Sequence, residues 1–173
     1  MQAFAVEARD RVCADLGCST GGFTDCLLQH GAAKVYAIDT GYGVLDWTLR
    51  KNPRVVVLER TNALHMQLPE PVDLISIDAG WTKQEKILPH ARKLLKPGGR
   101  IITLIKPHYE AQPAQLRKGI LPAELVSGIV DSVITQIEQS GMTVAARIES
   151  PIKGQKGNAE VLALVIPRAS ATI

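Results

Sequence analysis

The stretch Val12-Cys-Ala-Asp-Leu-Gly-Cys-Ser-Thr-Gly-Gly-Phe23 decides the fold, because it passes from apolar residues through glycines into an amphipathic segment. Residues 12–16 predict a buried strand, the glycines a tight loop, and residues 22–30 a helix. Glycines let the backbone approach a ligand closely, and the start of a helix offers free N–H groups. The stretch therefore predicts a strand–loop–helix unit that can hold a ligand at its loop.

A second acidic residue stands at a distance from the loop that is typical of nucleoside-binding folds. Asp39 ends the apolar run at 34–38 and follows Asp15 by 24 residues. At that spacing a carboxylate can hold the two hydroxyl groups of a ribose. The glycine loop alone could be an ordinary strand–helix turn. Together with the spaced acid, it predicts a nucleoside cofactor.

The order of the glycines indicates which cofactor this is. A dinucleotide loop reads G-x-G-x-x-G, but Ser19 stands where the second glycine belongs. No Gly-Lys-Ser/Thr follows, which argues against a nucleoside triphosphate. The pattern D-x-G-x-x-x-G instead resembles the first motif of methyltransferases that use S-adenosylmethionine (SAM). That resemblance implies that SAM is held by Asp15, Gly17, Ser19, Gly21 and Phe23, with Asp39 on its ribose.

Length and composition indicate an ordinary soluble globular protein. The 173 residues predict one domain, 1–173, and the 46% hydrophobic and 21% charged content are average. No apolar run reaches the roughly 20 residues of a membrane span, and the first residues lack a signal-peptide core. Three cysteines in no zinc-binding spacing predict free thiols, no metal and a cytoplasmic location. The net charge of +3 suits a polyanionic partner.

The remaining pattern predicts a doubly wound α/β sheet. Several apolar runs are continuous, as expected for parallel strands that are buried on both faces. We expect strands at 12–16, 34–38, 54–59, 72–77, 100–105, 143–149 and 160–166, and helices at 22–30, 44–51, 83–95 and 123–140. Lys96-Pro-Gly-Gly99 predicts a turn after the third helix. The last two strands are joined only by 150–158, which predicts an antiparallel hairpin in a seven-stranded, mostly parallel, Rossmann-like sheet.

Three charged residues are predicted to meet at one edge of this sheet. Asp78 and Lys106 each follow a parallel strand, and Glu160 opens the antiparallel last strand. All three positions lie at the carboxyl edge, where open α/β sheets bind ligands. Each residue alone could be a loop cap or a surface charge. Their coincidence beside a cofactor loop predicts an active site.

Longer stretches resemble the TlyA-type, hemolysin-like branch of the FtsJ-like RNA 2′-O-methyltransferases. The matching stretches are Asp15–Asp25, Asp39-Thr-Gly-Tyr-Gly43, Asp46–Arg50, Asn52–Asn62, Ile105–Glu110 and Gly154-Gln-Lys-Gly-Asn-Ala-Glu160. The resemblance implies SAM as cofactor, rRNA as substrate, and Asp78, Lys106 and Glu160 as the last three members of a Lys-Asp-Lys-Glu catalytic tetrad. It also places Asp78 beside the cofactor and Asn62 near its adenine.

The first lysine of that tetrad has no evident counterpart in the sequence, and the alignment of Phe4 puts it a few residues before Met1. The RNA-binding S4 domain of the family has no counterpart either. Two other interpretations therefore stay open. One is a non-catalytic module that binds SAM and RNA. The other is a small-molecule methyltransferase, which a closed and apolar active edge would favour.

Basic and aromatic residues at the same edge predict an RNA surface. We expect phosphate contacts from Lys83, Lys118, Lys153 and Lys156, although ordinary solvated lysines would look the same in sequence. Trp81 and Tyr109 could stack an unpaired base. The long segment 107–121 is a candidate substrate loop.

Overall fold

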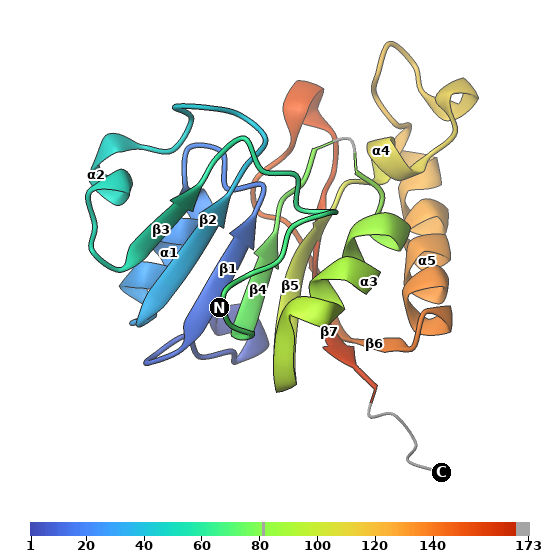
Figure 1. The fold of residues 1–173 in the computed structure, drawn as a ribbon. Helices are drawn as coiled ribbons and strands as arrows, with labels where there is room; N and C mark the ends of the chain where they lie inside the picture. The colour runs from blue at the N-terminus through green and yellow to red at the C-terminus, as the bar shows by residue number, and fades with distance from the viewer. Residues whose placement is uncertain (81, 169–173) are drawn as a thin grey trace.

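One mixed sheet organises the chain, and the computed structural model describes residues 1–80 and 82–168 of it (Figure 1). The strand order is β3-β2-β1-β4-β5-β7-β6. The strands are β1 (Val12–Leu16), β2 (Lys34–Ile38), β3 (Val55–Leu58), β4 (Val72–Ile77), β5 (Leu95–Ile105), β6 (Met142–Glu149) and β7 (Val161–Pro167). The helices are α1 (Gly22–Gln29), α2 (Trp47–Arg50), α3 (Gln84–Leu94), α4 (Pro107–Glu110) and α5 (Ala123–Gln139). Short 3₁₀ turns lie at Gln2–Phe4, Pro113–Gln115 and Gln155–Gly157.

The strand directions confirm the predicted sheet. Strands β1 to β5 pair in parallel, while β7 runs antiparallel to both β5 and β6. The strand order reverses between β1 and β4, the point at which sheets of this kind bind ligands beyond the strand ends. The predicted hairpin is therefore present, and its second strand lies inside the sheet.

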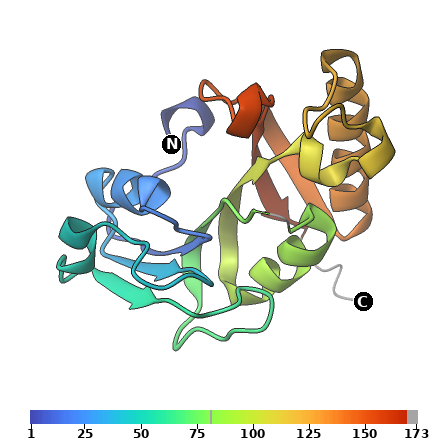
Figure 2. The ribbon, with the colours of Figure 1, turned by 90° about the horizontal axis from the view of Figure 1, so that it is seen from above.

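Helices cover the sheet on both faces, with α1 on one side and α3 and α5 on the other (Figure 2). On β4, Leu74 belongs to the core beneath α1, whereas its neighbour Ile75 belongs to the core beneath α3 and α5. Successive residues of a strand point to opposite faces, so a strand covered on both sides needs apolar residues at every position. This explains the continuous apolar runs of the sequence.

Two predicted boundaries are wrong. Residues 96–99, predicted as a turn, belong to β5, whose pairing with β4 passes from Val72↔Leu95 to Leu74↔Arg100. The extra residues are taken up by this bulge, so the chain enters the sheet directly at the end of α3. The helix predicted at 44–51 is reduced to α2, because residues 41–45 form a loop.

In the part of the chain that the structure covers, no helix has both the length and the apolar character needed to cross a membrane.

Candidate functional site

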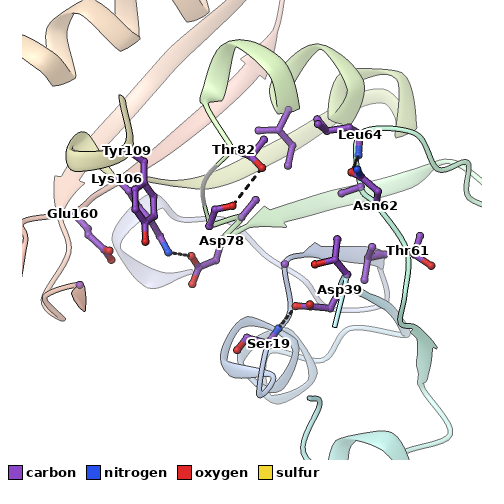
Figure 3. Close-up of a pocket in the computed structure, with 18 of the residues that line it drawn as sticks. Ser19, Asp39, Thr61, Asn62, Leu64, Asp78, Thr82, Lys106, Tyr109 and Glu160 are labelled. Atoms are coloured by element: carbon purple, nitrogen blue, oxygen red, sulfur yellow. Dashed lines mark hydrogen bonds and ion pairs between the residues drawn. The ribbon is translucent and has the colours of Figure 1, made fainter. Parts of the chain in front are cut away.

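A cleft of about 510 Å³ lies at the carboxyl ends of the parallel strands (Figure 3). Ser19, Asp39 and Asn62 line one end of it. Asp78, Lys106 and Glu160 line the other end. The structure thus brings together these six predicted residues from six different connecting segments. In residues 1–80 and 82–168, no group of three His, Cys, Asp or Glu side chains is arranged to hold a metal ion.

Gly17 gives the loop after β1 its shape. Its φ of +83° belongs to the left-handed region, and a Cβ there would lie 2.5 Å from the carbonyl oxygen of Asp78. A side chain at this position would meet both backbone strain and a backbone clash. The glycine therefore lets the loop after β1 pass directly against the loop after β4, and it lines the cleft itself.

Asp39 is fixed by backbone N–H groups. Its Oδ2 accepts a hydrogen bond of 2.9 Å from the N–H of Ser19, and its Oδ1 accepts one of 2.8 Å from the N–H of Gly41. The Asp39 carbonyl accepts from the N–H of Thr61, which also lines the cleft. One carboxylate thus joins two loops at the rim. Each carboxylate oxygen has a further lone pair, which leaves capacity for ribose hydroxyl groups.

Lys106 and Asp78 form an ion pair at the other end of the cleft, with 2.6 Å between Nζ and Oδ1. Their side chains are 18% and 33% exposed, so the pair is only partly shielded from solvent. Glu160 lies on the far side of Lys106 from Asp78 and is buried (Figure 3). Burial raises the pKa of Glu160, an effect that the nearby Lys106 ammonium opposes. The arrangement can hold and exchange a proton at the lysine amine.

Gly154 was not predicted individually, although the quoted stretch 154–160 contains it. It lines the cleft, and a Cβ there would lie 2.1 Å from Oε1 of Glu160. We expect Gly154→Ala to displace the Glu160 carboxylate and to lower methyl transfer at least about tenfold, since a small misplacement at a reacting centre is costly. SAM binding, measured by calorimetry, should stay unchanged. Full activity in this variant would show that the position of Glu160 is unimportant.

His108 was also not predicted individually, although the stretch Ile105–Glu110 contains it. It lines the cleft yet is only 6% exposed, and its Nδ1 is buried with no hydrogen-bond partner. Burial, together with the Lys106 charge, lowers the pKa of His108. Both effects favour the neutral form of the imidazole beside Lys106.

Three residues predicted to contact the cofactor lie away from the cleft. Asp15 is fully buried, where its Oδ2 accepts from the Thr24 hydroxyl and its Oδ1 from the Ser76 hydroxyl. Gly21 packs against Leu45 and Leu49, and Phe23 lines a small apolar hollow near Phe4. These three residues therefore do not line the cleft. Asp15 instead ties β1 to α1 and β4, on either side of the loop that lines the cleft.

The pKa of Asp15 is raised to about 6 by burial, against the effect of its two hydroxyl partners. A carboxyl whose pKa is higher in the folded state destabilises the fold at pH values above the unfolded pKa of about 4, and fully so above the folded pKa. We expect Asp15→Asn to raise the free energy of unfolding at pH 7.5 by roughly 1–3 kcal/mol. The amide can accept from Thr24 and donate to Ser76, whose hydroxyl has a second acceptor in the Ala14 carbonyl.

Urea unfolding at pH 4.5 and 7.5 measures this effect. The difference between Asp15→Asn and the unaltered chain should shrink as the pH falls, because the buried carboxyl then takes up its proton. A difference that is independent of pH would show that Asp15 does not titrate with a raised pKa. Asp15→Leu, the control, should destabilise at both pH values because it removes the carboxylate that accepts from the Thr24 and Ser76 hydroxyl groups.

The predicted basic residues lie on elements around the cleft. Lys156 Nζ donates to the Lys118 carbonyl at 3.1 Å, which joins the 150–158 loop to the 107–121 segment. Lys83 Nζ donates to the Glu110 carbonyl at 3.3 Å, on α4. Lys153 lines a separate groove beside the start of α5. Figure 1 shows α4 and the 150–158 loop together above the strand ends.

The two predicted base-stacking residues fare differently. Tyr109 lines the cleft, with its ring centroid 5.9 Å from Lys106 Nζ, whereas Trp81 lies outside the described residues. The segment 107–121, predicted as a loop, contains α4 and a 3₁₀ turn and is held to the 150–158 loop by Asn158, which accepts from the N–H of Leu121.

Known proteins resemble this chain over most of its length. Hemolysin A of Brachyspira hyodysenteriae is 40% identical over 166 residues, which cover 92% of this chain and 69% of that protein. The 16S/23S rRNA (cytidine-2′-O)-methyltransferase TlyA of Mycobacterium tuberculosis is 39% identical over 166 residues, covering 92% of this chain and 62% of that protein. The chain thus spans about two thirds of these relatives.

Comparison with solved structures agrees with the sequence comparison. A hemolysin structure from Streptococcus thermophilus superimposes with a TM-score of 0.93 at 34% identity, over 98% of this chain and 63% of that one. The FtsJ-like methyltransferase family matches residues 1–165. The chain therefore belongs to the FtsJ-like methyltransferase family.

Proposed function

We propose that the protein transfers the methyl group of SAM to a ribose 2′-hydroxyl of rRNA. The observation that carries this proposal is the pairing of Lys106 with Asp78, beside Glu160, at the opposite end of one cleft from Asp39. A carboxylate suited to a nucleoside and an amine suited to proton transfer thus share a single cavity. The substrate named for TlyA supports rRNA as the acceptor.

The cleft fits SAM in size and chemistry. Its volume of about 510 Å³ lies in the range of small-ligand sites. We assign the amino-acid end of SAM to the loop of Gly17 and Ser19, the ribose to Asp39, and the adenine to the wall near Asn62. SAM supplies an activated methyl group on a sulfonium ion, so the protein mainly has to align the acceptor and manage its proton.

We assign the acceptance of that proton to Lys106. A ribose hydroxyl is a weak nucleophile with a high pKa, and a neutral amine within hydrogen-bond reach can accept its proton. The oxygen would then bond to the methyl carbon as the methyl–sulfur bond breaks, and S-adenosylhomocysteine would be the leaving group. Asp78, 2.6 Å from Nζ, then stabilises the ammonium that forms. Glu160 limits the directions in which the amine can turn. Between turnovers, the proton leaves to solvent through the partly exposed rim.

The charged lining also bears on the small-molecule alternative. That alternative depended on a closed, apolar active edge, whereas Asp78, Lys106 and Glu160 line this one. No observation of the structure favours a small-molecule substrate.

Transfer of tritiated methyl from SAM to rRNA of a methylation-deficient host tests the proposal. Digestion to nucleosides and mass spectrometry should find a 2′-O-methyl nucleoside. Methyl groups found only on bases would overturn the assignment. SAM binding without transfer to any RNA would instead support the non-catalytic module.

The RNA surface makes a separate prediction. Lys118→Ala and Lys156→Ala should each weaken RNA binding and lower the slope of log Kd against log salt by about one, because each lost phosphate contact releases fewer counterions. Fluorescence anisotropy over a salt series measures this slope. Lys93→Ala is the control, since Lys93 is exposed near the end of α3 at the opposite edge of the sheet. Equal slopes in all variants would contradict the surface.

A further inference from the structure

Two aromatic side chains are displayed to solvent on the segment that follows β2. Tyr42 is 72% exposed and Trp47 is 63% exposed. The chain contains only two tryptophans, three tyrosines and two phenylalanines, so aromatic residues are scarce. Large aromatic rings normally contribute to cores or interfaces. These two rings therefore contribute little to the packing of this domain.

A positively charged side chain lies over each ring. The guanidinium carbon of Arg60 lies 4.3 Å from the Tyr42 ring centroid, and Lys51 Nζ lies 4.7 Å from that of Trp47. Both distances are typical of cation–π contacts. Each pair therefore combines an aromatic ring with a positive charge. Tyr42, Trp47 and Lys51 belong to the segment between β2 and β3, and Arg60 follows β3.

The fold holds this segment in a defined conformation. Glu59, whose side chain is 6% exposed, accepts hydrogen bonds from the N–H groups of Gly43 and Val44 and pairs with Arg50 of α2. Arg60 has a φ of +53°, and its N–H donates to the Gly41 carbonyl at 3.0 Å. A non-glycine residue in the left-handed region carries a conformational cost that often marks a functional segment. Here it places the guanidinium over the ring.

The segment adjoins the cleft on the side away from the lysines. Its Gly41 N–H bonds to Asp39, which lines the cleft. It belongs to the β2–β3 end of the sheet, whereas Lys106, Lys118 and Lys156 belong to the β5–β7 end. Figure 1 shows α2 and the loop before it at the opposite end of the strand edge from α4.

We propose that Tyr42 and Trp47 stack on unpaired bases of the RNA substrate while Arg60 and Lys51 contact the adjoining phosphates. Bases stack on aromatic side chains in single-stranded RNA recognition, and neighbouring cations meet the backbone. A protein partner fits less well, because a cation lies over each ring. This surface extends the RNA footprint across the cofactor side of the cleft, and it rests on the function proposed above.

Binding of a fluorescein-labelled single-stranded RNA of about twelve nucleotides tests the surface. We expect Tyr42→Ala and Trp47→Ala each to raise the Kd about tenfold. Tyr42→Phe, which keeps the ring, should bind within about twofold of the unaltered chain, and Lys93→Ala should not differ from it. An RNA of equal length with abasic sites should bind all these proteins equally weakly. SAM affinity, measured by calorimetry, should stay constant throughout.

The outcomes separate this proposal from the function on which it rests. If methyl transfer to rRNA proceeds and the alanine variants keep their RNA affinity and their KM for RNA, the stacking surface is wrong while the function stands. If no RNA is methylated but the alanine variants still lose RNA affinity, the surface stands and the proposed reaction fails. Equal binding of the intact and abasic RNA by the unaltered chain would also overturn the stacking role.

Discussion

Replacing Lys106 with alanine should abolish methyl transfer while leaving SAM affinity nearly unchanged. The amine pairs with Asp78 at 2.6 Å at the acceptor end of the cleft, away from Asp39. General bases contribute about 10²–10⁴-fold to rate, so the loss should reach at least that range. Tritiated methyl incorporation into rRNA measures activity, and calorimetry measures SAM binding.

Lys106→Arg is the informative companion to this variant. Arginine keeps its proton and has a planar, forked head, so it should restore the ion pair with Asp78 but not the transfer. If arginine restored activity, Lys106 would act by its charge alone and not by proton exchange. Undiminished transfer in Lys106→Ala would show that the catalytic lysine has been misassigned.

Of the substitutions proposed above and below, Asp39→Ala should cause the largest loss in SAM affinity. In the proposed function the carboxylate provides acceptors for the ribose, and in the structure it holds the N–H groups of Ser19 and Gly41. Its removal should therefore affect both the ligand and the two loops. One hydrogen bond to a charged group is worth about 1.5–3 kcal/mol, or roughly 10- to 150-fold in Kd. Calorimetric titration with SAM and with S-adenosylhomocysteine should show this loss for both ligands.

Asp39→Asn separates the two roles of this residue. The amide keeps one acceptor for a loop N–H and removes the charge, so its SAM affinity should lie between those of the alanine variant and the unaltered chain. Asp25→Ala is the matched control, because Asp25 lies on α1 outside the cleft and contacts Gln29. Unchanged SAM affinity in Asp39→Ala, or tight binding of NAD, would overturn the cofactor assignment.

The sequence could predict elements whose signal is local. For β1, β2 and β4 the predicted and observed bounds agree at every residue. This is because strands buried on both faces must be apolar throughout. The same logic located Asp39, Asp78 and Lys106, since a polar residue that ends such a run must lie at the edge of the sheet. Once the hairpin was recognised, the position of Glu160 followed from strand direction alone.

Other features depended on partners that are distant in the sequence. The alternation of side chains along β1 did not reveal that Asp15 faces Thr24 and Ser76 instead of the cleft. The start of β5 depended on a bulge opposite β4, which Pro97 and Gly98 gave no reason to expect. The exposure of Tyr42 and Trp47 depended on Glu59, which holds their loop from the next strand end.

The sequence by itself therefore determined which apolar runs form strands, where the glycine loop after the first strand lies, and which charged residues stand at the strand ends. Only the tertiary structure decided which of these residues enter the cleft, which are buried behind it, and which aromatic rings stay exposed. The physical reason is that periodicity reports the face on which a side chain lies, whereas hydrogen bonding and close packing with residues far along the chain determine what that side chain can touch.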